Sequence, residues 1–485
     1  MTTHHIVAML PPAWGHTISY IYVAVQMLTK DSTLVVTILQ HNIIVSQMEA
    51  ELATCSYDKT RLRIIGVGDK DIPRVGPNGP EESFHQLADG WMDTIPRLCQ
   101  GTDGWPKPQT IHLDFGCGGL IIEETKKILG PKCKVLVWFS SALASTPACL
   151  NEYDFTAIAR EIFSDENKRN GRSMDDILLQ VIVAWNGSDK LSGAIVKFPG
   201  APDMYDHERG AYAAGPPEGF KLILPTAQTL AKAADGYIVP TSACFEPVGV
   251  PRALCGQDSA PVALTNEMLK LFLGNSVETY GANSVLYISF GSLFFPIATP
   301  QLIEALVNTL LNLVKPFPFV LALGGKLAAL PKELIERVNS TGKGLVCDFW
   351  VEQRAILQHP AIGWFLTHGG FNSISESLAE GVPLIVWPVG GEQPVNAAFL
   401  SSDPNPVAFE LLQIRTGPQL GPSLRGGPRI TGTVVDATEE FKATFDAARG
   451  ARGATLRSNG IRLAEALKES AAGEASEEII RLAKF

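Results

Sequence analysis

Residues 364–376 read WFLTHGGFNSISE and join a short apolar run to a segment with helical spacing. The adjacent glycines clear space, so histidine, asparagine and serine side chains can converge there with the free N–H groups of a helix. Because the amino end of a helix favours negative charge, this stretch predicts an anion site built without lysine. Two plainer interpretations stay open: Ser373 with Glu376 fits a capping box, and Phe371 fits an ordinary core position.

Similar apolar runs alternate with helical periodicity along the chain, which is typical of parallel sheets covered on both faces. One series of predicted strands comprises 6–10, 34–39, 63–67, 110–114, 134–139 and 237–240, and a second comprises 285–290, 319–323, 345–348, 364–367 and 383–387. A proline-containing segment separates the two series near residue 255, and residues 439–485 predict two or three amphipathic helices. Longer polar insertions are expected at about 70–107 and 162–215. The predicted fold class is α/β with two sheets.

The composition narrows the classes of function. A chain of 485 residues is long enough for two or three domains, and 40 basic against 50 acidic side chains give a net charge of −10, which argues against nucleic acid as a partner. The eight cysteines form no CxxC pair and no metal-ligand spacing, so reduced thiols in the cytoplasm are expected. The sequence contains no apolar run of about 18 residues, so no transmembrane anchor is expected.

A second motif follows the first predicted strand and contains Gly15 and His16. Helical spacing over 17–28 puts His16 at the amino end of a helix, where the dipole disfavours imidazolium and keeps the ring a neutral base. Asp114 ends another predicted strand, and its carboxylate can accept the Nδ1–H of His16 if the two strands are neighbours. The alternatives are that His16 only caps the helix or packs in the turn, and that Asp114 only caps the next helix.

A third motif, Gly291-Ser292, follows the first strand of the second series. Glycine lets the backbone approach a ligand closely, and the serine hydroxyl can donate to a phosphate oxygen. The sequence has neither GxGxxG after a strand nor GxxxxGK[ST], which argues against a dinucleotide or a nucleoside triphosphate.

Residues 350–393 resemble the donor-binding signature of family 1 UDP-dependent glycosyltransferases, enzymes of the GT-B fold. The matching residues are Trp350 to Gln353, His359-Pro360, Thr367 to Ser373, Glu376, Gly381 to Pro383 and Glu392-Gln393, and the Gly15-His16, Asp114 and Gly291-Ser292 motifs also occur in family order. The chain departs from the plant form at Glu352, Gly369 and Phe371, where Pro, Cys and Trp are common.

The resemblance implies two Rossmann-like domains that face each other across an interdomain cleft. Residues 1–255 would bind the acceptor, 256–455 would bind the UDP-sugar, and 456–485 would form C-terminal helices packing back toward the N-terminal domain.

The resemblance also implies roles for individual residues. Trp350 would stack on uracil, the backbone of Val351 would read the base edge, and Gln353 with Glu376 would hold the ribose hydroxyls. The diphosphate would be held by Ser292, His368, Gly370, Asn372 and Ser373, and the sugar by Glu392 and Gln393, of which the terminal Gln393 favours UDP-glucose. Further candidate contacts to donor or acceptor are Gly15, Thr17, Ser140 and Phe371.

The implied reaction is direct displacement with inversion, in which His16, oriented by Asp114, takes the proton of an acceptor hydroxyl. The co-substrate would be a UDP-sugar, and no metal or other cofactor would be needed. The acceptor would be a small lipophilic molecule, and the protein would act as a monomer. Aromatic candidates for the acceptor site are Trp14, Phe84, Trp91 and Trp105. A UDP-sugar epimerase of the same fold, a non-catalytic UDP-sugar binder and an NAD-dependent oxidoreductase are the competing hypotheses.

Overall fold

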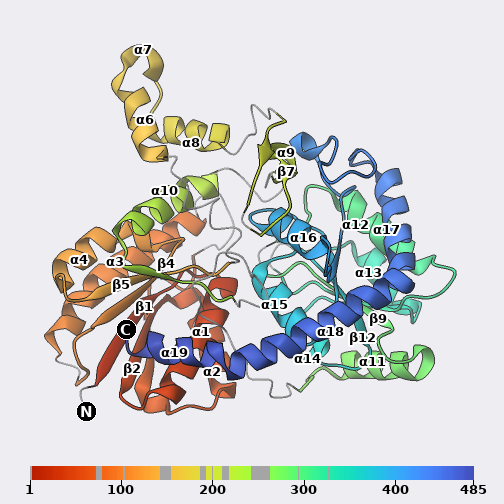
Figure 1. The fold of residues 1–485 in the computed structure, drawn as a ribbon, viewed down its shortest axis with the longest axis horizontal. Coiled ribbons are helices and arrows are strands. Elements are labelled where there is room, and N and C mark those ends of the chain that lie inside the picture. Colours follow the sequence, from red (N-terminus) through yellow and green to blue (C-terminus); the bar gives the residue numbers. More distant parts are fainter. Residues whose placement is uncertain are drawn as a thin grey trace. The chain divides into compact units, whose positions relative to one another are not determined.

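The structure is a computed structural model, and it describes residues 3–72, 79–101, 104–141, 154–185, 193–198, 200–209, 218–241, 263–292, 294–325 and 328–485. The chain divides into two compact units, the first formed by 1–185, 215–257 and 469–485 and the second by 186–214 and 258–468 (Figure 1). The boundary expected near residue 255 lies outside the described residues. The expected domain limits therefore stay predictions.

The first unit contains a six-stranded parallel sheet with the order β3-β2-β1-β4-β5-β8. Its strands are β1 (His4–Met9), β2 (Leu34–His41), β3 (Leu62–Val67), β4 (Thr110–Asp114), β5 (Lys134–Trp138) and β8 (Gly236–Ile238). The first series of predicted strands is thus confirmed. Strand order reverses between β1 and β4, the point at which loops after neighbouring strands diverge and ligands bind in open α/β sheets.

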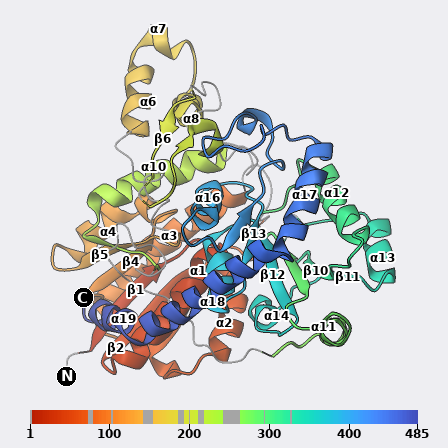
Figure 2. The ribbon, with the colours of Figure 1, turned by 45° about the vertical axis from the view of Figure 1, so that its right-hand side comes forward.

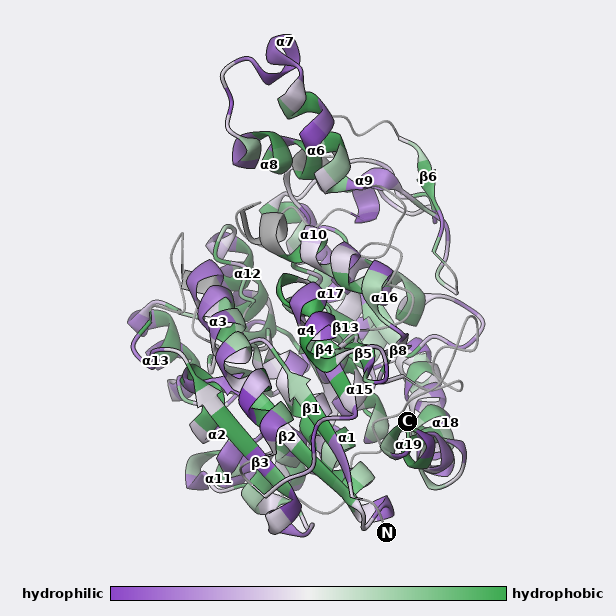
Figure 3. Cartoon of the chain, turned by 90° about the vertical axis from the view of Figure 1, so that its left-hand side faces the viewer, coloured by the Kyte–Doolittle hydropathy of each residue, from purple (hydrophilic) through white to green (hydrophobic). Residues whose placement is uncertain are grey.

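Both faces of this sheet are covered by helices. Helices α1 (Trp14–Lys30), α2 (Asn42–Thr54) and α19 (Glu474–Ala483) share one core with Ile6 and Ala8, whereas α3 (Gly79–Gln100), α4 (Ile122–Leu129) and α10 (Glu218–Ala233) share another with Val7 and Met9. Figures 1 and 2 show these two groups on opposite sides of the strands. Since successive strand residues point to opposite faces, a strand buried on both sides reads as a continuous apolar run. Figure 3 shows that character in β1 and β2 and the mixed character of α3 and α4.

The second unit contains another six-stranded parallel sheet, with the order β11-β10-β9-β12-β13-β14. Its strands are β9 (Val285–Ser289), β10 (Phe319–Ala322), β11 (Gly344–Cys347), β12 (Ile362–Thr367), β13 (Leu384–Val386) and β14 (Ala408–Glu410). The second predicted series is confirmed, and β14 is an additional edge strand. The surrounding helices are α11 (Glu267–Tyr280), α12 (Pro300–Leu311), α13 (Lys332–Ser340), α14 (Gln353–Leu357), α15 (Phe371–Ala379), α16 (Gln393–Ser401), α17 (Val434–Ala448) and α18 (Ala451–Ala472).

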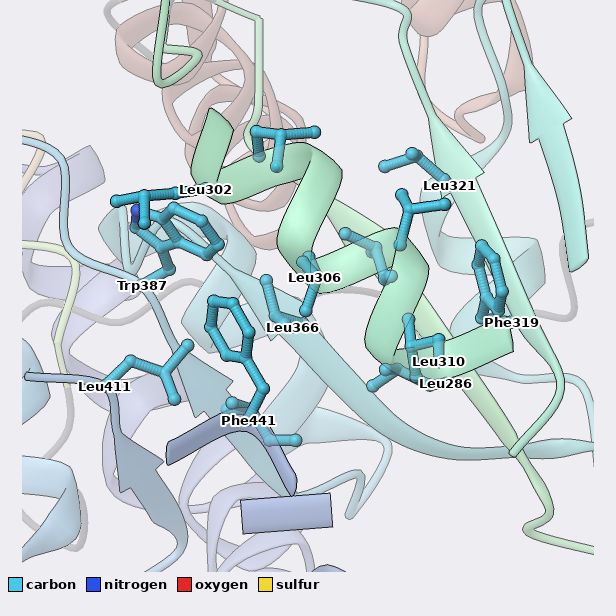
Figure 4. Close-up of a cluster of buried hydrophobic side chains, with 14 of the residues drawn as sticks. Leu286, Leu302, Leu306, Leu310, Phe319, Leu321, Leu366, Trp387, Leu411 and Phe441 are labelled. Atoms are coloured by element: carbon cyan, nitrogen blue, oxygen red, sulfur yellow. The ribbon is translucent and has the colours of Figure 1, made fainter. Parts of the chain in front are cut away.

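Helices α12 and α17 close one face of the second sheet. Leu302, Leu306 and Leu310 recur at helical spacing along α12 and meet apolar side chains of the strands, and Phe441 of α17 stacks on Trp387 at a ring-centroid distance of 5.6 Å (Figure 4). The core therefore fixes the strands whose carboxyl ends carry the predicted anion site.

The remaining elements are short. They are the antiparallel pair β6 (Ile195–Val196) and β7 (Met204–Tyr205), the helices α6 (Phe155–Ser164), α7 (Glu166–Arg169), α8 (Met174–Trp185) and α9 (Asp206–Arg209), and 3₁₀ turns at Lys59–Arg61, Gly118–Leu120 and Gly417–Gln419. The expectation of a polar insertion over 70–107 is wrong for α3, because Leu87, Trp91 and Ile95 of this helix are buried in the core. Helices in the described part of the chain lack the combination of length and apolarity that a bilayer crossing requires.

Candidate active site

His16 and Asp114 meet at the carboxyl edge of the first sheet. Helix α1 begins at Trp14, three residues earlier than predicted, so His16 lies in its first turn. The Nδ1 atom of His16 is 2.9 Å from Oδ2 of Asp114, and the side chains are 28% and 0% exposed. The cap of α1 is Ala13, which excludes a capping role for His16. Oδ1 of Asp114 accepts a 2.8 Å hydrogen bond from the Gly116 N–H. One carboxylate oxygen thus stabilises the backbone turn after β4, and the other contacts the imidazole.

Aromatic side chains fix the surroundings of the imidazole. Phe115 stacks on His16 at a centroid distance of 5.3 Å, and Phe139 packs against Phe115 at 4.6 Å. Trp138 Nε1 donates to the backbone carbonyl of His16 at 3.1 Å. The sequence analysis did not identify these supports, because they depend on which loops follow neighbouring strands.

The further candidates beside His16 differ in exposure. Gly15 is partly exposed in the first turn of α1. Thr17 is fully buried, donates to the Ala13 carbonyl at 3.0 Å and accepts from Gln40 at 3.1 Å, so its hydroxyl stabilises the turn. Ser140 is 7% exposed, and its hydroxyl has no hydrogen-bond partner among the described residues.

The aromatic acceptor candidates do not gather around His16. Trp91 is fully buried and donates to Thr125 at 2.9 Å, so its proposed contact with an acceptor is wrong. Trp105 packs on His5 at the amino end of β1, which is the edge of the sheet opposite His16. The predicted acceptor contact of Trp105 is therefore also wrong. Trp14 and Phe84 are partly buried against the two cores of the first unit.

The predicted anion site lies at the carboxyl edge of the second sheet. Strand β12 ends at Thr367, and α15 begins at Phe371 with Gly370 as its cap. Ser373 is therefore the third helical residue, and the capping-box interpretation is wrong. Asn372 is half-buried beside it, and Phe371 is 6% exposed, as a core residue would be.

The His368 imidazole lies so close to the backbone of two glycines that neither position has room for a Cβ atom. Gly291 has φ +75°, and a Cβ atom there would lie 2.7 Å from Cε1 of His368. A Cβ atom on Gly370 would lie 2.4 Å from Nε2 of the same ring. Phe294 stacks on His368 at 5.5 Å, and Ser292 is half-buried in the turn that Gly291 makes. The imidazole is thus clamped between the loops after β9 and β12.

Burial lowers the pKa of His368 from 6.5 to about 4, because the charged ring would lose its water. At neutral pH the imidazole is uncharged, and one of its nitrogens carries a proton that it can donate to an anion. An anion bound here can therefore meet a hydrogen-bond donor that carries no full positive charge.

Acidification is expected to destabilise the fold in part through His368. Between pH 6.5 and about 4 the unfolded chain binds a proton at this residue that the folded chain does not bind. Stability therefore rises with pH across this window and is lost as the pH falls, with a slope of up to about 1.4 kcal/mol per pH unit. Urea unfolding at several pH values should give a shallower slope for His368→Gln than for the wild type. An equal slope for the two proteins would contradict the neutral buried imidazole.

Gln353 and Glu376, each of which is expected to hold the ribose, are hydrogen-bonded to each other. Gln353 Nε2 donates to Oε2 of Glu376 at 2.8 Å, and the Tyr287 hydroxyl donates to Oε1 of Gln353 at 3.4 Å. Trp350, just before this pair, is 55% exposed, whereas Val351 is buried. An open aromatic face beside a carboxylate and an amide suits a base and a ribose.

The two residues expected to hold the sugar lie at the start of α16. Glu392 caps this helix and is half-buried. Gln393 is 1% exposed, and its Oε1 accepts 2.8 Å bonds from the Val389 and Gly390 N–H groups. A sugar contact by Gln393 would therefore use Nε2. Asn396, which the sequence analysis missed, lies three residues further along α16 and donates to the Gly369 carbonyl at 3.0 Å.

Sequence comparison places the chain among known proteins. A family model described as UDP-glucoronosyl and UDP-glucosyl transferase matches residues 250–416. The UDP-glycosyltransferase eriJ of Hericium erinaceus is 31% identical over 287 residues, which cover 53% of this chain and 55% of that protein. A 7-deoxyloganetin glucosyltransferase of Gardenia jasminoides is 39% identical over 126 residues, which cover 25% of each chain. The chain thus matches about half the length of the first relative and about a quarter of the second.

Solved structures resemble the chain over nearly its whole length. Medicago truncatula UGT71G1, complexed with UDP-glucose, has a TM-score of 0.68 at 17% identity and covers 99% of this chain and 98% of its own. Phytolacca americana UGT2, complexed with UDP-2fluoro-glucose and pterostilbene, has a TM-score of 0.67 at 19% identity and covers 99% of each chain. These likenesses show the fold. Residues 250–416 therefore match the family of UDP-glucoronosyl and UDP-glucosyl transferases, and the chain has the GT-B fold of these solved structures.

Proposed function

We propose that this protein transfers a sugar, in the first instance glucose, from a UDP-sugar to a hydroxyl group of a small lipophilic acceptor with inversion at the anomeric carbon. The observation that carries the proposal is the 2.9 Å contact between the partly exposed His16 ring and the buried Asp114 carboxylate. A buried carboxylate on Nδ1 holds that nitrogen as the donor, which leaves the chemistry of a base to Nε2.

In this mechanism His16 accepts the acceptor proton as the oxygen attacks the anomeric carbon. The new C–O bond forms while the bond to the diphosphate breaks, and the electron pair leaves with UDP. The imidazolium that forms is stabilised by Asp114, and Oδ1 of that carboxylate stays bonded to the Gly116 N–H throughout. Asp114 therefore orients the base and needs no proton of its own.

The second unit would bind the donor. Trp350 and the backbone of Val351 would hold uracil, and Gln353 with Glu376 would hold the ribose. The diphosphate would meet Ser292, Asn372, Ser373, the backbone at Gly370 and the neutral His368, which are dipolar groups already in place when charge develops. Glu392 and Nε2 of Gln393 would contact the sugar, and Gly15, Ser140 and Phe371 remain candidate contacts.

Relatives support the acceptor class. The Phytolacca americana structure contains pterostilbene, and the Gardenia jasminoides relative is named for glucosylation of 7-deoxyloganetin. The acceptor class that we propose for this chain is a small, largely apolar frame that carries a hydroxyl. Phe115 and Phe139 beside His16 would give such a frame an aromatic contact. Action as a monomer, without a metal and in the cytoplasm is part of the proposal.

Donor binding tests the proposal. Calorimetry of the wild type with UDP-glucose, UDP-galactose, UDP-glucuronate and NAD should give tight uptake of UDP-glucose and no uptake of NAD. Absence of binding to every uridine nucleotide would contradict the transferase proposal. Binding of UDP-glucose without transfer to any acceptor would indicate a non-catalytic binder, and conversion of the sugar without an acceptor would indicate an epimerase.

A further inference from the structure

Helix α1 is joined to strand β4 by two side-chain bridges, one deeper than the other. The outer bridge is the contact between His16 and Asp114, and the inner bridge joins the Tyr20 hydroxyl to Nδ1 of His112 at 2.8 Å. Residues four apart lie on one face of a helix, and residues two apart lie on one face of a strand. Tyr20 and His112 therefore repeat the pairing of His16 and Asp114 one helical turn further into the protein.

The inner bridge is completely buried. Both Tyr20 and His112 are 0% exposed. Burial lowers the pKa of His112 from 6.5 to about 3 and raises the pKa of Tyr20, so both side chains are uncharged at neutral pH. The contact is thus a neutral hydrogen bond in a dry environment, where its direction is strongly constrained.

The buried His112 ring is not explained by stability. Its Nε2 atom has no hydrogen-bond partner among the described residues. A buried nitrogen left without a partner destabilises the folded state, and an apolar pair at these two positions would avoid that loss. The contribution of the His112 ring therefore comes from its other nitrogen, Nδ1, which is hydrogen-bonded to the Tyr20 hydroxyl.

Trp138 connects the inner bridge to the backbone of His16. The Tyr20 ring packs edge-on against Trp138 at a centroid distance of 5.1 Å, and Trp138 Nε1 donates to the His16 carbonyl at 3.1 Å. Strand β5, which carries Trp138, pairs with β4 in the register Asp114↔Trp138. The first turn of α1 is therefore tied to both strands beneath the His16 ring.

We propose that Tyr20 and His112 are positioning residues for His16: their bond fixes the rotation of α1 on β4, and so keeps Nδ1 of His16 in contact with Asp114. This inference rests on the proposed role of His16 as the base. A directional bond one turn away matters because a reacting group displaced by about 1 Å can lose about a hundredfold in rate.

Tyr20→Phe tests the inference with the smallest change. The variant keeps the ring against Trp138 and removes only the hydroxyl. We expect kcat at saturating UDP-glucose to fall about tenfold, with the donor KM unchanged. The matched control is Tyr22→Phe on the same helix, whose hydroxyl donates to Glu51 of α2 and not to β4. The control should keep the wild-type kcat.

Two further variants separate positioning from a general effect on folding. Tyr20→Phe alone leaves Nδ1 of His112 without its partner, which should lower the melting temperature. In Tyr20→Phe/His112→Leu both polar groups are gone, so the melting temperature should equal or exceed that of the wild type while kcat stays low. In the His16→Ala background, Tyr20→Phe should change the residual rate no further. Recovery of kcat together with the melting temperature, or an equal loss in the His16→Ala background, would overturn the inference.

A readout without turnover keeps this inference separate from the proposed function. The Nδ1 proton that His16 shares with Asp114 should give a downfield NMR signal in the wild type, assigned by its absence in His16→Ala. The signal should be lost or broadened in Tyr20→Phe and kept in Tyr22→Phe. A wild type that binds no donor would refute the proposed function alone, whereas an unchanged signal in Tyr20→Phe would refute the positioning role.

Discussion

Replacing His16 with alanine is expected to lower turnover by about two to four powers of ten, with UDP-glucose affinity unchanged. The imidazole is the base of the proposed displacement, and it belongs to the first unit, whereas the proposed nucleotide contacts belong to the second. The loss should therefore appear in kcat, measured as product formed at saturating donor, and not in donor binding measured by calorimetry.

The matched control for this variant is His85→Ala. His85 of α3 also lies near a carboxylate, with Nε2 3.9 Å from Oε1 of Glu81, but both side chains are about half exposed. An exposed pair of this kind contributes little, so the control should keep its rate and stability. Turnover close to wild type in His16→Ala, or a loss explained by weaker donor binding, would contradict the role assigned to His16.

Replacing Glu376 with alanine is expected to weaken UDP binding about ten- to a hundredfold, because each hydrogen bond to a charged group contributes about 1.5 to 3 kcal/mol. The variant loses the carboxylate that would accept from the ribose hydroxyls and also the 2.8 Å partner of Gln353. Because the proposed role of the Glu376 carboxylate is to hold the ribose hydroxyls, the variant should also discriminate less between UDP and 2′-deoxy-UDP.

Glu380→Ala is the matched control for Glu376→Ala. Glu380 lies one turn further along, just after α15, and accepts a 3.0 Å bond from Gln358, which repeats the Gln353–Glu376 arrangement away from the cap of the helix. The control should bind UDP as the wild type does. Equal losses for the two variants, or an unchanged preference for UDP over 2′-deoxy-UDP in Glu376→Ala, would show that Glu376 does not hold the ribose.

The sheets could be predicted because strands buried on both faces are short apolar runs with a clear beginning and end. The contact between His16 and Asp114 could be predicted for a related reason, since β1 and β4 are neighbours and parallel strands bring their carboxyl ends to one edge. The edge strand Ala408–Glu410 was missed because three residues carry no recognisable period.

Other features depend on packing that the sequence does not reveal. Ser373 followed by Glu376 matches a capping box, but the backbone turn at Gly370 starts the helix three residues before that box would allow. Trp91 resembled an acceptor contact because an aromatic residue in a polar segment is ambiguous until the helix is placed against its strands. The bond between Tyr20 and His112 requires knowing which strand α1 crosses.

The anomeric configuration of the product tests the central claim most directly. UDP-glucose carries an α-linked sugar, so a single displacement assisted by His16 must deliver a β-linked product. Incubation of the wild type with UDP-glucose and a panel of small phenols and terpenoid alcohols, followed by proton NMR of any glucoside, measures the configuration at the anomeric carbon. The account predicts a β-glucoside that His16→Ala forms about two to four powers of ten more slowly; an α-glucoside, or the same β-glucoside formed at an equal rate by His16→Ala, would contradict it.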